Sequence, residues 1–219
     1  MNLRIIITGA TGMVGEGVLL ECLRDPAVEA VLLLSRKPSG YAHPKLRELL
    51  HADFQHLAAV ETQLTGYNAC FYCAGVSSLG ISQAEYERVT YDTTLAVAQT
   101  LLRLNPDLVF CYVTGAGTDS SERGRSHWAR TKGRAENALL RLPFRARYVS
   151  ARLHARHVWP AQRAQYVQIR ELALSRLSKI DHQIRFHHGG GRGCHAHCGE
   201  ERLPQTRTGS ARHCGTGGR

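Results

Sequence analysis

Three glycines spaced three apart, Gly9, Gly12 and Gly15, are the strongest chemical signal in this chain of 219 residues. They follow the apolar run Leu3–Thr8 and precede an apolar spacing typical of a helix. The first glycine permits a tight turn, the second lets backbone approach a phosphate group, and the third lets the helix pack closely. The free amides and the positive dipole end of that helix then face an anion. The segment therefore predicts a site for the pyrophosphate of a dinucleotide.

The end of the second predicted strand indicates which dinucleotide binds. That strand, Ala30–Leu34, is followed by Ser35, Arg36 and Lys37, with no acidic residue among them. An Asp or Glu there would accept a hydrogen bond from the ribose 2′-hydroxyl of NAD, whereas Arg36 can pair with the 2′-phosphate of NADP. We therefore expect NADP in preference to NAD. The alternative is that both cations are solvated on a surface loop.

Strand and helix patterns alternate along the first 150 residues, which predicts an α/β fold with a Rossmann-type, doubly wound parallel sheet. Apolar periodicity and turn residues place six strands. They are Leu3–Thr8, Ala30–Leu34, Leu49–Ala52, Ala69–Cys73, Leu108–Thr114 and Ala146–Ser150. A first helix follows the glycines and ends at Asp25-Pro26. Two further helices, at Ser82–Leu104 and Ser126–Leu142, end before Asn105-Pro106 and before Pro143.

Residues 1–150 resemble the atypical and extended short-chain dehydrogenase/reductases, which include NAD-dependent epimerases and NmrA-like proteins. Thr8–Gly15 is similar to the Thr-Gly-x-x-Gly-x-x-Gly loop of that family, Asp53 to its adenine contact, and Ala74-Gly75 to its turn beside the cofactor. The resemblance implies an NAD(P)-binding domain at 1–150. The implied cofactor-binding residues are Thr8, Gly9, Thr11, Gly12, Met13, Val14, Gly15, Arg36, Asp53, Ala74, Gly75 and Lys132.

The same resemblance implies a catalytic group. Thr114 matches the Ser or Thr that hydrogen-bonds the reacting oxygen, and Lys132 matches the lysine that holds the nicotinamide ribose. The tyrosine expected four residues before this lysine is Trp128, which can position a substrate or cover the nicotinamide but cannot act as a general acid. His127 can titrate, yet on a helix it points about 100° away from Trp128. The plainer alternatives are that Lys132 is a solvated helix lysine and that the Thr114 hydroxyl only satisfies a backbone group at the strand end.

The implied function is reversible hydride transfer on a small carbonyl or sugar-like substrate, by an oxidoreductase or epimerase. The tryptophan at position 128 keeps a second function open, an NmrA-like protein that senses NADP without turnover and regulates a partner. The resemblance also implies that Ser82–Leu104 and Ser126–Leu142 could pair in a homodimer.

The remaining features of this half favour structural roles. Cys70 and Cys73 have redox-pair spacing, but positions three apart on a strand face opposite sides of a sheet. With Cys22 and Cys111 they are expected to be buried small hydrophobes of a protein in a reducing cytoplasm. No charged-then-apolar leader and no apolar run of about 18 residues is apparent, so we expect no membrane insertion.

Residues 151–219 differ sharply in composition. They hold 12 of the 28 Lys and Arg but 4 of the 18 Asp and Glu, and 8 of the 12 His, with little periodicity. This composition predicts an irregular, disordered basic tail. A nucleic-acid-binding arm is disfavoured, and so is a metal site at Cys194, His195, His197 and Cys198, because four ligands within five residues cannot easily surround one zinc ion.

We favour a third interpretation, a frameshift near residues 149–152. If each codon is read from its second base, the codons that can encode Arg152–Pro160 also allow a different segment, which contains Pro-Gly. That segment resembles the loop after the sixth strand of the family. The same shift gives an apolar segment from Cys194–Cys198 and a helix with a family-like ending from Arg207–Thr216. The expected consequence is that this chain lacks the substrate pocket and last strand of its relatives.

Overall fold

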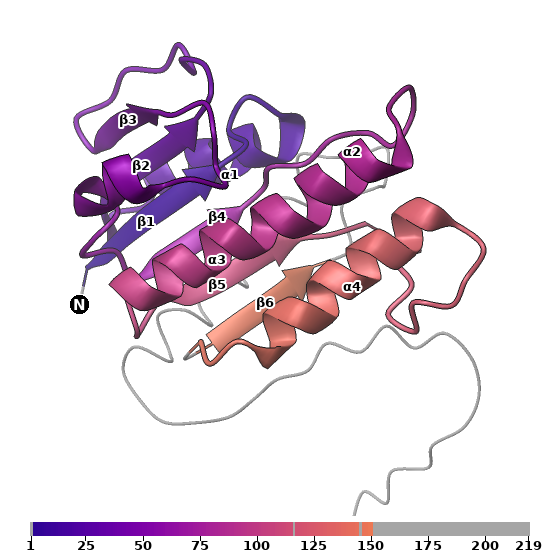
Figure 1. Cartoon of the computed structure of the whole chain (residues 1–219). Coiled ribbons are helices and arrows are strands. Elements are labelled where there is room, and N and C mark those ends of the chain that lie inside the picture. The colour runs from indigo at the N-terminus through magenta and orange to yellow at the C-terminus, as the bar shows by residue number, and fades with distance from the viewer. Residues whose placement is uncertain (1, 116, 145, 151–219) are drawn as a thin grey trace, which may run out of the picture. The chain divides into compact units, whose positions relative to one another are not determined.

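The computed structural model describes residues 2–115, 117–144 and 146–150 (Figure 1). The predicted tail, 151–219, lies outside the described residues. In chain order the elements are β1 (Leu3–Thr8), α1 (Met13–Arg24), β2 (Val28–Ser35), β3 (Leu46–Leu50), the 3₁₀ segment η1 (Ala58–Gln63), β4 (Ala69–Tyr72), α2 (Gln83–Glu87), the π-helical segment η2 (Arg88–Asp92), α3 (Thr93–Leu104), β5 (Val109–Val113), α4 (His127–Arg141) and β6 (Ala146–Ser150).

The six strands form one parallel sheet in the order β3-β2-β1-β4-β5-β6. This is the doubly wound order of dinucleotide-binding folds, so the predicted fold class is confirmed. The strand order reverses between β1 and β4. In open sheets of this kind, ligands bind in the crevice outside the carboxyl ends of the strands at that switch point. The loops after β1 and β4 are therefore the expected walls of a site.

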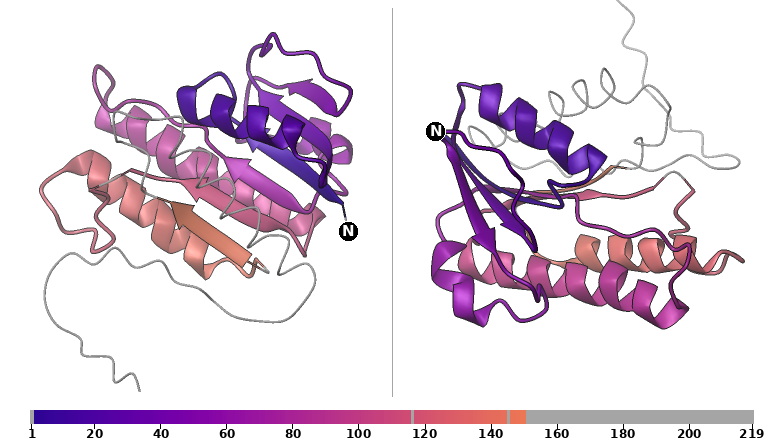
Figure 2. Two further views of the ribbon diagram at one scale, coloured as in Figure 1. Left: turned by 180° about the vertical axis from the view of Figure 1, so that it is seen from behind. Right: turned by 90° about the horizontal axis from the view of Figure 1, so that it is seen from above.

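Helices cover both faces of the sheet, with α1 on one face and α2, α3 and α4 on the other (Figure 2). Strand residues alternate between the two resulting cores because successive side chains point to opposite faces. Ile6, Tyr72 and Phe110 pack in the core beneath α3 and α4, while Ile5 and Phe71 pack in the core beneath α1. Burial on both faces explains why these strands read as continuous apolar runs.

The predicted bounds of β1 and β6 match the structure, and those of β2, β4, β5 and the helices differ by at most two residues. The prediction for the third strand is wrong, because β3 spans Leu46–Leu50 and ends two residues before Ala52. It is an edge strand in which Leu49 alone is buried, so its sequence carries little apolar alternation.

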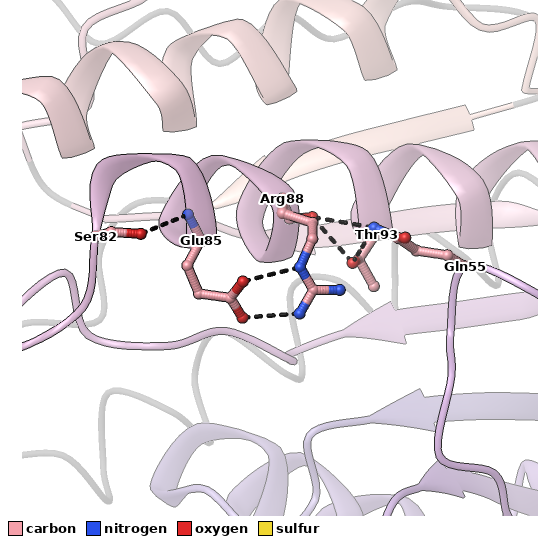
Figure 3. Close-up of polar contacts among 5 residues, drawn as sticks. All are labelled: Gln55, Ser82, Glu85, Arg88 and Thr93. Carbon is pink, nitrogen blue, oxygen red and sulfur yellow. Dashed lines mark hydrogen bonds and ion pairs between the residues drawn. The ribbon is translucent and has the colours of Figure 1, made fainter.

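The predicted helix Ser82–Leu104 is interrupted by η2, where the backbone widens to π-helical bonding. The amide of Thr93 donates to the carbonyl oxygen of Arg88 five residues earlier, and the Thr93 hydroxyl donates to the same oxygen at 3.0 Å (Figure 3). Gln55, from the loop after β3, donates to Thr93 Oγ1 at 3.2 Å. At the start of this helix the Ser82 hydroxyl accepts from the amide of Glu85 and caps the helix.

No helix in the part of the chain that the structure describes is long and apolar enough to cross a membrane.

Candidate functional site

The glycine loop is built on contact between the ends of β1 and β4. Gly9 has a φ of +69°, a conformation that L side chains rarely adopt, and a Cβ atom there would lie 2.6 Å from the amide nitrogen of Ala74. A Cβ on Gly15 would overlap the carbonyl oxygen of Gly9. The hydroxyl of Thr8 accepts a hydrogen bond from the amide of Ala74 at 3.2 Å. The loop can therefore pack this tightly only with glycine at positions 9 and 15.

The loop presents the N-terminus of α1 to solvent. Gly12 is the N-cap residue and has no side chain that could occupy the amides of the first helical turn. Thr11, Gly12 and Met13 are exposed, Met13 to 62%, while Val14 is half-buried. An anion could therefore reach these amides directly. A Cβ on Gly12 would meet only the Gly9 carbonyl oxygen, at 3.4 Å, so glycine here keeps the approach to the amides open rather than avoiding a clash.

Arg36 and Lys37 are exposed and directly follow β2, the neighbour of β1 in the sheet. The hydroxyl of Ser35 donates to the carbonyl oxygen of Lys37 at 2.9 Å, and the amide of His51 donates to the carbonyl oxygen of Ser35. These bonds fix the turn that carries both cations. The structure places the two cations at the strand end where the sequence predicts a 2′-phosphate contact.

Asp53 lies after β3, at the same edge of the sheet. Its carboxylate accepts hydrogen bonds from Nδ1 of His56 at 2.7 Å and from the amide of Gln55 at 2.9 Å. These two bonds, the one from His56 foremost, lower the pKa of Asp53. Asp53 is exposed, so its remaining acceptor positions can meet an amino group of a ligand.

Beyond Ala74, the turn after β4 continues through Gly75, which is exposed and has no neighbour where a Cβ atom would stand. A side chain at position 75 would therefore point into the crevice rather than into protein. The predicted cofactor-binding residues after β1, β2, β3 and β4 all lie at the carboxyl-end edge of the sheet.

Thr114 follows β5 and is 3% exposed. Its hydroxyl oxygen lies 2.5 Å from Oε1 of Glu136 on α4 and 2.9 Å from the hydroxyl oxygen of Thr118. Both bonds are within the protein, so a substrate oxygen reaches this hydroxyl only by displacing a partner. Thr118 is half-buried and stands nearer to solvent.

Glu136 was not predicted from the sequence. It is 8% exposed and lies one helical turn after Lys132, between the buried residues Ala135 and Leu139. A glutamate on the apolar side of α4 is the signal that could have identified it. Burial raises the pKa of Glu136, although hydrogen bonds from nearby hydroxyls and the charge of Lys132 oppose that shift.

Lys132 is half-buried, and its Nζ lies 5.5 Å from the ring centroid of Tyr112 on β5. Burial lowers the pKa of Lys132, and the nearby Glu136 carboxyl acts in the opposite direction. Thr114, Lys132 and Glu136 therefore lie around the end of β5 and the middle of α4.

Trp128 and His127 point to different elements, as helical geometry predicts. The Trp128 ring lies over Gly117 in the loop after β5, with Cη2 3.5 Å from the position of a Gly117 Cβ. The ring of His127 instead meets Tyr86 of α2 edge-on, with centroids 6.3 Å apart. The structure therefore brings Trp128, and not His127, to the loop that carries Thr118.

The loop between β5 and α4 is held against α4. The Asp119 carbonyl oxygen packs where Gly133 has no side chain, and the Asp119 amide donates to the carbonyl oxygen of Ala129. Asn137 donates to the carbonyl oxygen of Ser120 and to the carboxylate of Glu122. The turn is thus set by contacts with three successive turns of the helix.

Cys70 and Cys73 face opposite sides of the sheet, as predicted, because Cys70 packs in the core under α3 and Cys73 packs against the core under α1. Burial raises the pKa of Cys73 to about 12, so this thiol stays protonated at neutral pH. Among the described residues, no group of three or more His, Cys, Asp and Glu could hold a metal ion. Cys194, His195, His197 and Cys198 lie outside the described residues.

Relatives among known proteins match part of the chain. "Leucinostatins biosynthesis cluster protein T" of Purpureocillium lilacinum is 27% identical over 143 residues, which are 64% of this chain and 52% of that protein. "Hybrid PKS-NRPS synthetase poxE" of Penicillium oxalicum is 32% identical over 125 residues, which are 53% of this chain and 3% of that protein. The chain therefore spans about half of the first relative and a small part of the second.

Solved structures show the same fold. Uronate dehydrogenase from Agrobacterium tumefaciens superposes with a TM-score of 0.51 at 19% identity, covering 62% of this chain and 54% of that one. The Bordetella bronchiseptica enzyme WbmG, in complex with NAD and UDP, gives a TM-score of 0.53 at 14% identity, covering 66% and 51%.

A family described as "NAD dependent epimerase/dehydratase family" matches residues 5–176, well over half of the chain and past the predicted frameshift. This match includes the glycine loop, the strand-end residues and the group around Lys132. The chain belongs to the NAD dependent epimerase/dehydratase family.

Proposed function

We propose that this protein binds NADP and transfers hydride reversibly to and from a small carbonyl or sugar-like substrate. The observation that carries the proposal is the glycine loop at the switch point of the sheet. Gly9 and Gly15 admit no side chain, and no side chain caps α1 at Gly12. This cradle fits a pyrophosphate group, which needs close backbone approach at the N-terminus of a helix.

The remaining cofactor contacts follow from placement along the same edge of the sheet. The glycine loop and the first turn of α1 would hold the pyrophosphate, Asp53 would accept from the adenine amino group, and Gly75 would leave room beside the nicotinamide half. Thr8 and Ala74 hold the two loops together. When bound, the cofactor supplies or accepts the hydride.

Arg36 supports the choice of NADP over NAD. Arg36 is exposed directly after β2 and is followed by Lys37. Positions 35–37 contain no carboxylate. A 2′-phosphate would gain a charge-assisted, bidentate partner there. The 2′-hydroxyl of NAD would find no carboxylate acceptor in positions 35–37.

In the catalytic half, Lys132 would hold the nicotinamide ribose, and Thr114 would act at the reacting oxygen. Trp128 would position the substrate or cover the nicotinamide, since its ring already borders the loop after β5. Indole cannot exchange a proton at neutral pH, so another group must do so if turnover occurs.

A second candidate function is an NADP sensor, which binds the cofactor without turnover and passes its occupancy to a partner. The observation that favours it is Trp128 in place of a titratable residue. The two functions share the cofactor site and differ only in chemistry.

One experiment separates them. NADPH oxidation by the full chain would be measured against a panel of aldehydes, ketones and sugars, alongside NADPH affinity. Turnover that is lost in Lys132→Ala supports hydride transfer. Tight NADPH binding with no turnover on any compound supports the sensor, and absence of binding would contradict both.

We also propose that residues 1–150 are the cofactor-binding domain and that the remainder is read out of frame. Resequencing the source gene across codons 145–156 tests this. One missing or extra base is the expected result, and the repaired chain should then be assayed. A gene that reads as given, with peptides of the tail found in cell extract, would overturn the frameshift.

A further inference from the structure

A carboxyl group sits inside a cluster of hydroxyl groups that cofactor binding does not explain. Glu136 is hydrogen-bonded to the hydroxyl of Thr114 at 2.5 Å and to that of Ser120 at 3.3 Å. Thr114 in turn lies 2.9 Å from the Thr118 hydroxyl, which donates to the carbonyl oxygen of Gly115 at 2.8 Å. The cluster joins a buried acid on α4 to the loop after β5.

The number of protons in this cluster indicates the state of the acid. Four oxygen–oxygen contacts need four protons, and the three hydroxyls supply only three. A protonated Glu136 supplies the fourth. An ionised Glu136 accepts from the Thr114 hydroxyl, and Thr118 donates to the carbonyl oxygen of Gly115, so no proton remains for the contact between Thr114 and Thr118. With Glu136 protonated, Glu136 would donate to Thr114 and Thr114 to Thr118, and every contact would have its proton. Ser120 donates to the second carboxyl oxygen, which accepts in either state.

The surroundings of Glu136 favour the same state. It is 8% exposed, and burial raises its pKa because the ionised form loses hydration. The charged and titratable groups that face it are Lys132 of its own helix and Tyr112 of β5. Burial lowers the pKa of Lys132. Burial is also the largest of several causes that raise the pKa of Tyr112. The charge of Lys132 acts in the opposite direction on the pKa of Glu136 and so stabilises the carboxylate once the proton has left.

The outer end of the chain of hydroxyls lies beside Trp128. Thr118 is half-buried and follows Gly117, against which the Trp128 ring packs. Trp128 occupies the position where the sequence resemblance places an acid/base tyrosine. The row of hydroxyl groups from Glu136 thus ends beside Trp128, where the resemblance expects a proton-donating tyrosine.

We propose that Glu136, Thr114 and Thr118 form a proton relay that supplies the proton Trp128 cannot provide. This inference rests on the proposed hydride-transfer function. In the reducing direction the substrate carbonyl carbon accepts a hydride, with its two electrons, from the reduced nicotinamide. The carbonyl oxygen takes the proton of Thr118, Thr118 takes that of Thr114, and Thr114 takes that of Glu136. The products are an alcohol, the oxidised cofactor and a Glu136 carboxylate, which water then reprotonates.

The protonated carboxyl can be tested without any turnover. Infrared difference spectra of the full chain at pH 7 would compare wild type with Glu136→Gln. The glutamine keeps the shape of the side chain, and its amide can still donate to Thr114. The expected result is a carboxylic-acid carbonyl stretch that is present in wild type and absent in the variant. Spectra that differ only in carboxylate bands would overturn the proposal.

The relay itself is tested by kinetics with NADPH and those aldehydes and ketones that the wild type reduces. Glu136→Gln and Thr118→Val should each lower kcat at least about 100-fold, the scale of general acid catalysis, with NADPH affinity unchanged. Thr118→Ser should restore turnover. A purely structural role predicts instead that Glu136→Gln stays active, and that result would overturn the relay.

The pH profile gives a readout that packing alone would not change. Wild-type reduction should decline as pH rises through the pKa of Glu136, because the carboxylate has no proton to donate. Ser120→Ala removes a hydrogen bond that favours the carboxylate, so the decline should move to higher pH. An unmoved profile would contradict the assignment. If the wild type shows no turnover, both the proposed hydride-transfer function and proton delivery by the relay are overturned. The infrared spectra then show separately whether Glu136 is protonated or ionised.

Discussion

Gly9 and Ala74 meet at the switch point of the sheet, where the amide nitrogen of Ala74 lies 2.6 Å from the place of a Gly9 Cβ. Gly12, three residues on, has no such clash and stands at the N-terminus of α1. The two glycines therefore serve different purposes within one loop. The first makes the fold possible, and the second keeps the ligand site open.

This difference predicts opposite outcomes for two alanine substitutions. Gly9→Ala should lower the free energy of unfolding by more than about 2 kcal/mol, because a positive φ costs about 1–2 kcal/mol and the backbone clash adds to it. Gly12→Ala should leave the thermal midpoint nearly unchanged but weaken NADPH binding at least about tenfold. Thermal unfolding and titration calorimetry measure both. Equal effects of the two variants on stability would contradict the assignment.

Arg36→Ala should lower NADPH affinity about tenfold or more, the scale of a charge-assisted hydrogen bond of about 1.5–3 kcal/mol, and leave NADH affinity unchanged. The physical reason is that only NADP carries a phosphate for the guanidinium. Arg141→Ala, at an exposed position at the end of α4, removes the same charge and serves as the control. A parallel loss for NADPH and NADH would place Arg36 outside the 2′-phosphate site.

Lys132→Met should raise stability while abolishing turnover. Burial lowers the pKa of Lys132, so the unfolded chain holds this proton more tightly and the charge costs stability at neutral pH. We expect the thermal midpoint of the variant to lie above that of the wild type at pH 7. The gain should shrink as pH is raised through the folded pKa of Lys132. A lower midpoint in the variant at pH 7 would show that the ammonium group stabilises the fold.

Gly133→Ala should destabilise the protein, although replacing a glycine within a helix usually gains up to about 1 kcal/mol. The Asp119 carbonyl oxygen occupies the space that a Cβ atom would need, so the loop after β5 would have to move. Chemical denaturation measures the change in unfolding free energy. Ala138→Gly, in the same helix, is the matched control for helix propensity. A stabilised Gly133→Ala variant would mean that the loop does not pack on α4 in solution.

The sequence could predict β1, which is buried on both faces, better than β3. β1 could be placed to the residue, since Leu3–Thr8 is a β-branched apolar run bounded by glycine. β3 could not, because an edge strand with only Leu49 buried has no clear pattern. The π-helical segment at Arg88–Asp92 escaped prediction since its bonding depends on Gln55, which comes from a distant loop.

The candidate site divides in the same way. The glycine loop and Arg36 follow from local sequence, because their roles depend on a turn and on the end of one strand. Glu136 does not, because its burial and its hydroxyl partners come from Thr114 and the loop after β5, brought near by the parallel sheet. The structure likewise shows what the motif could not, that the hydroxyl of Thr114 is already bonded inside the protein.

Titration of the full chain with NADPH and with NADH, with binding followed by calorimetry, tests the proposed cofactor site most directly. We predict one NADPH site per chain and an affinity for NADH at least about tenfold lower, consistent with one charge-assisted contact to the 2′-phosphate. Absence of binding by either cofactor would contradict the assignment of the glycine loop. Equal affinities would contradict the role of Arg36.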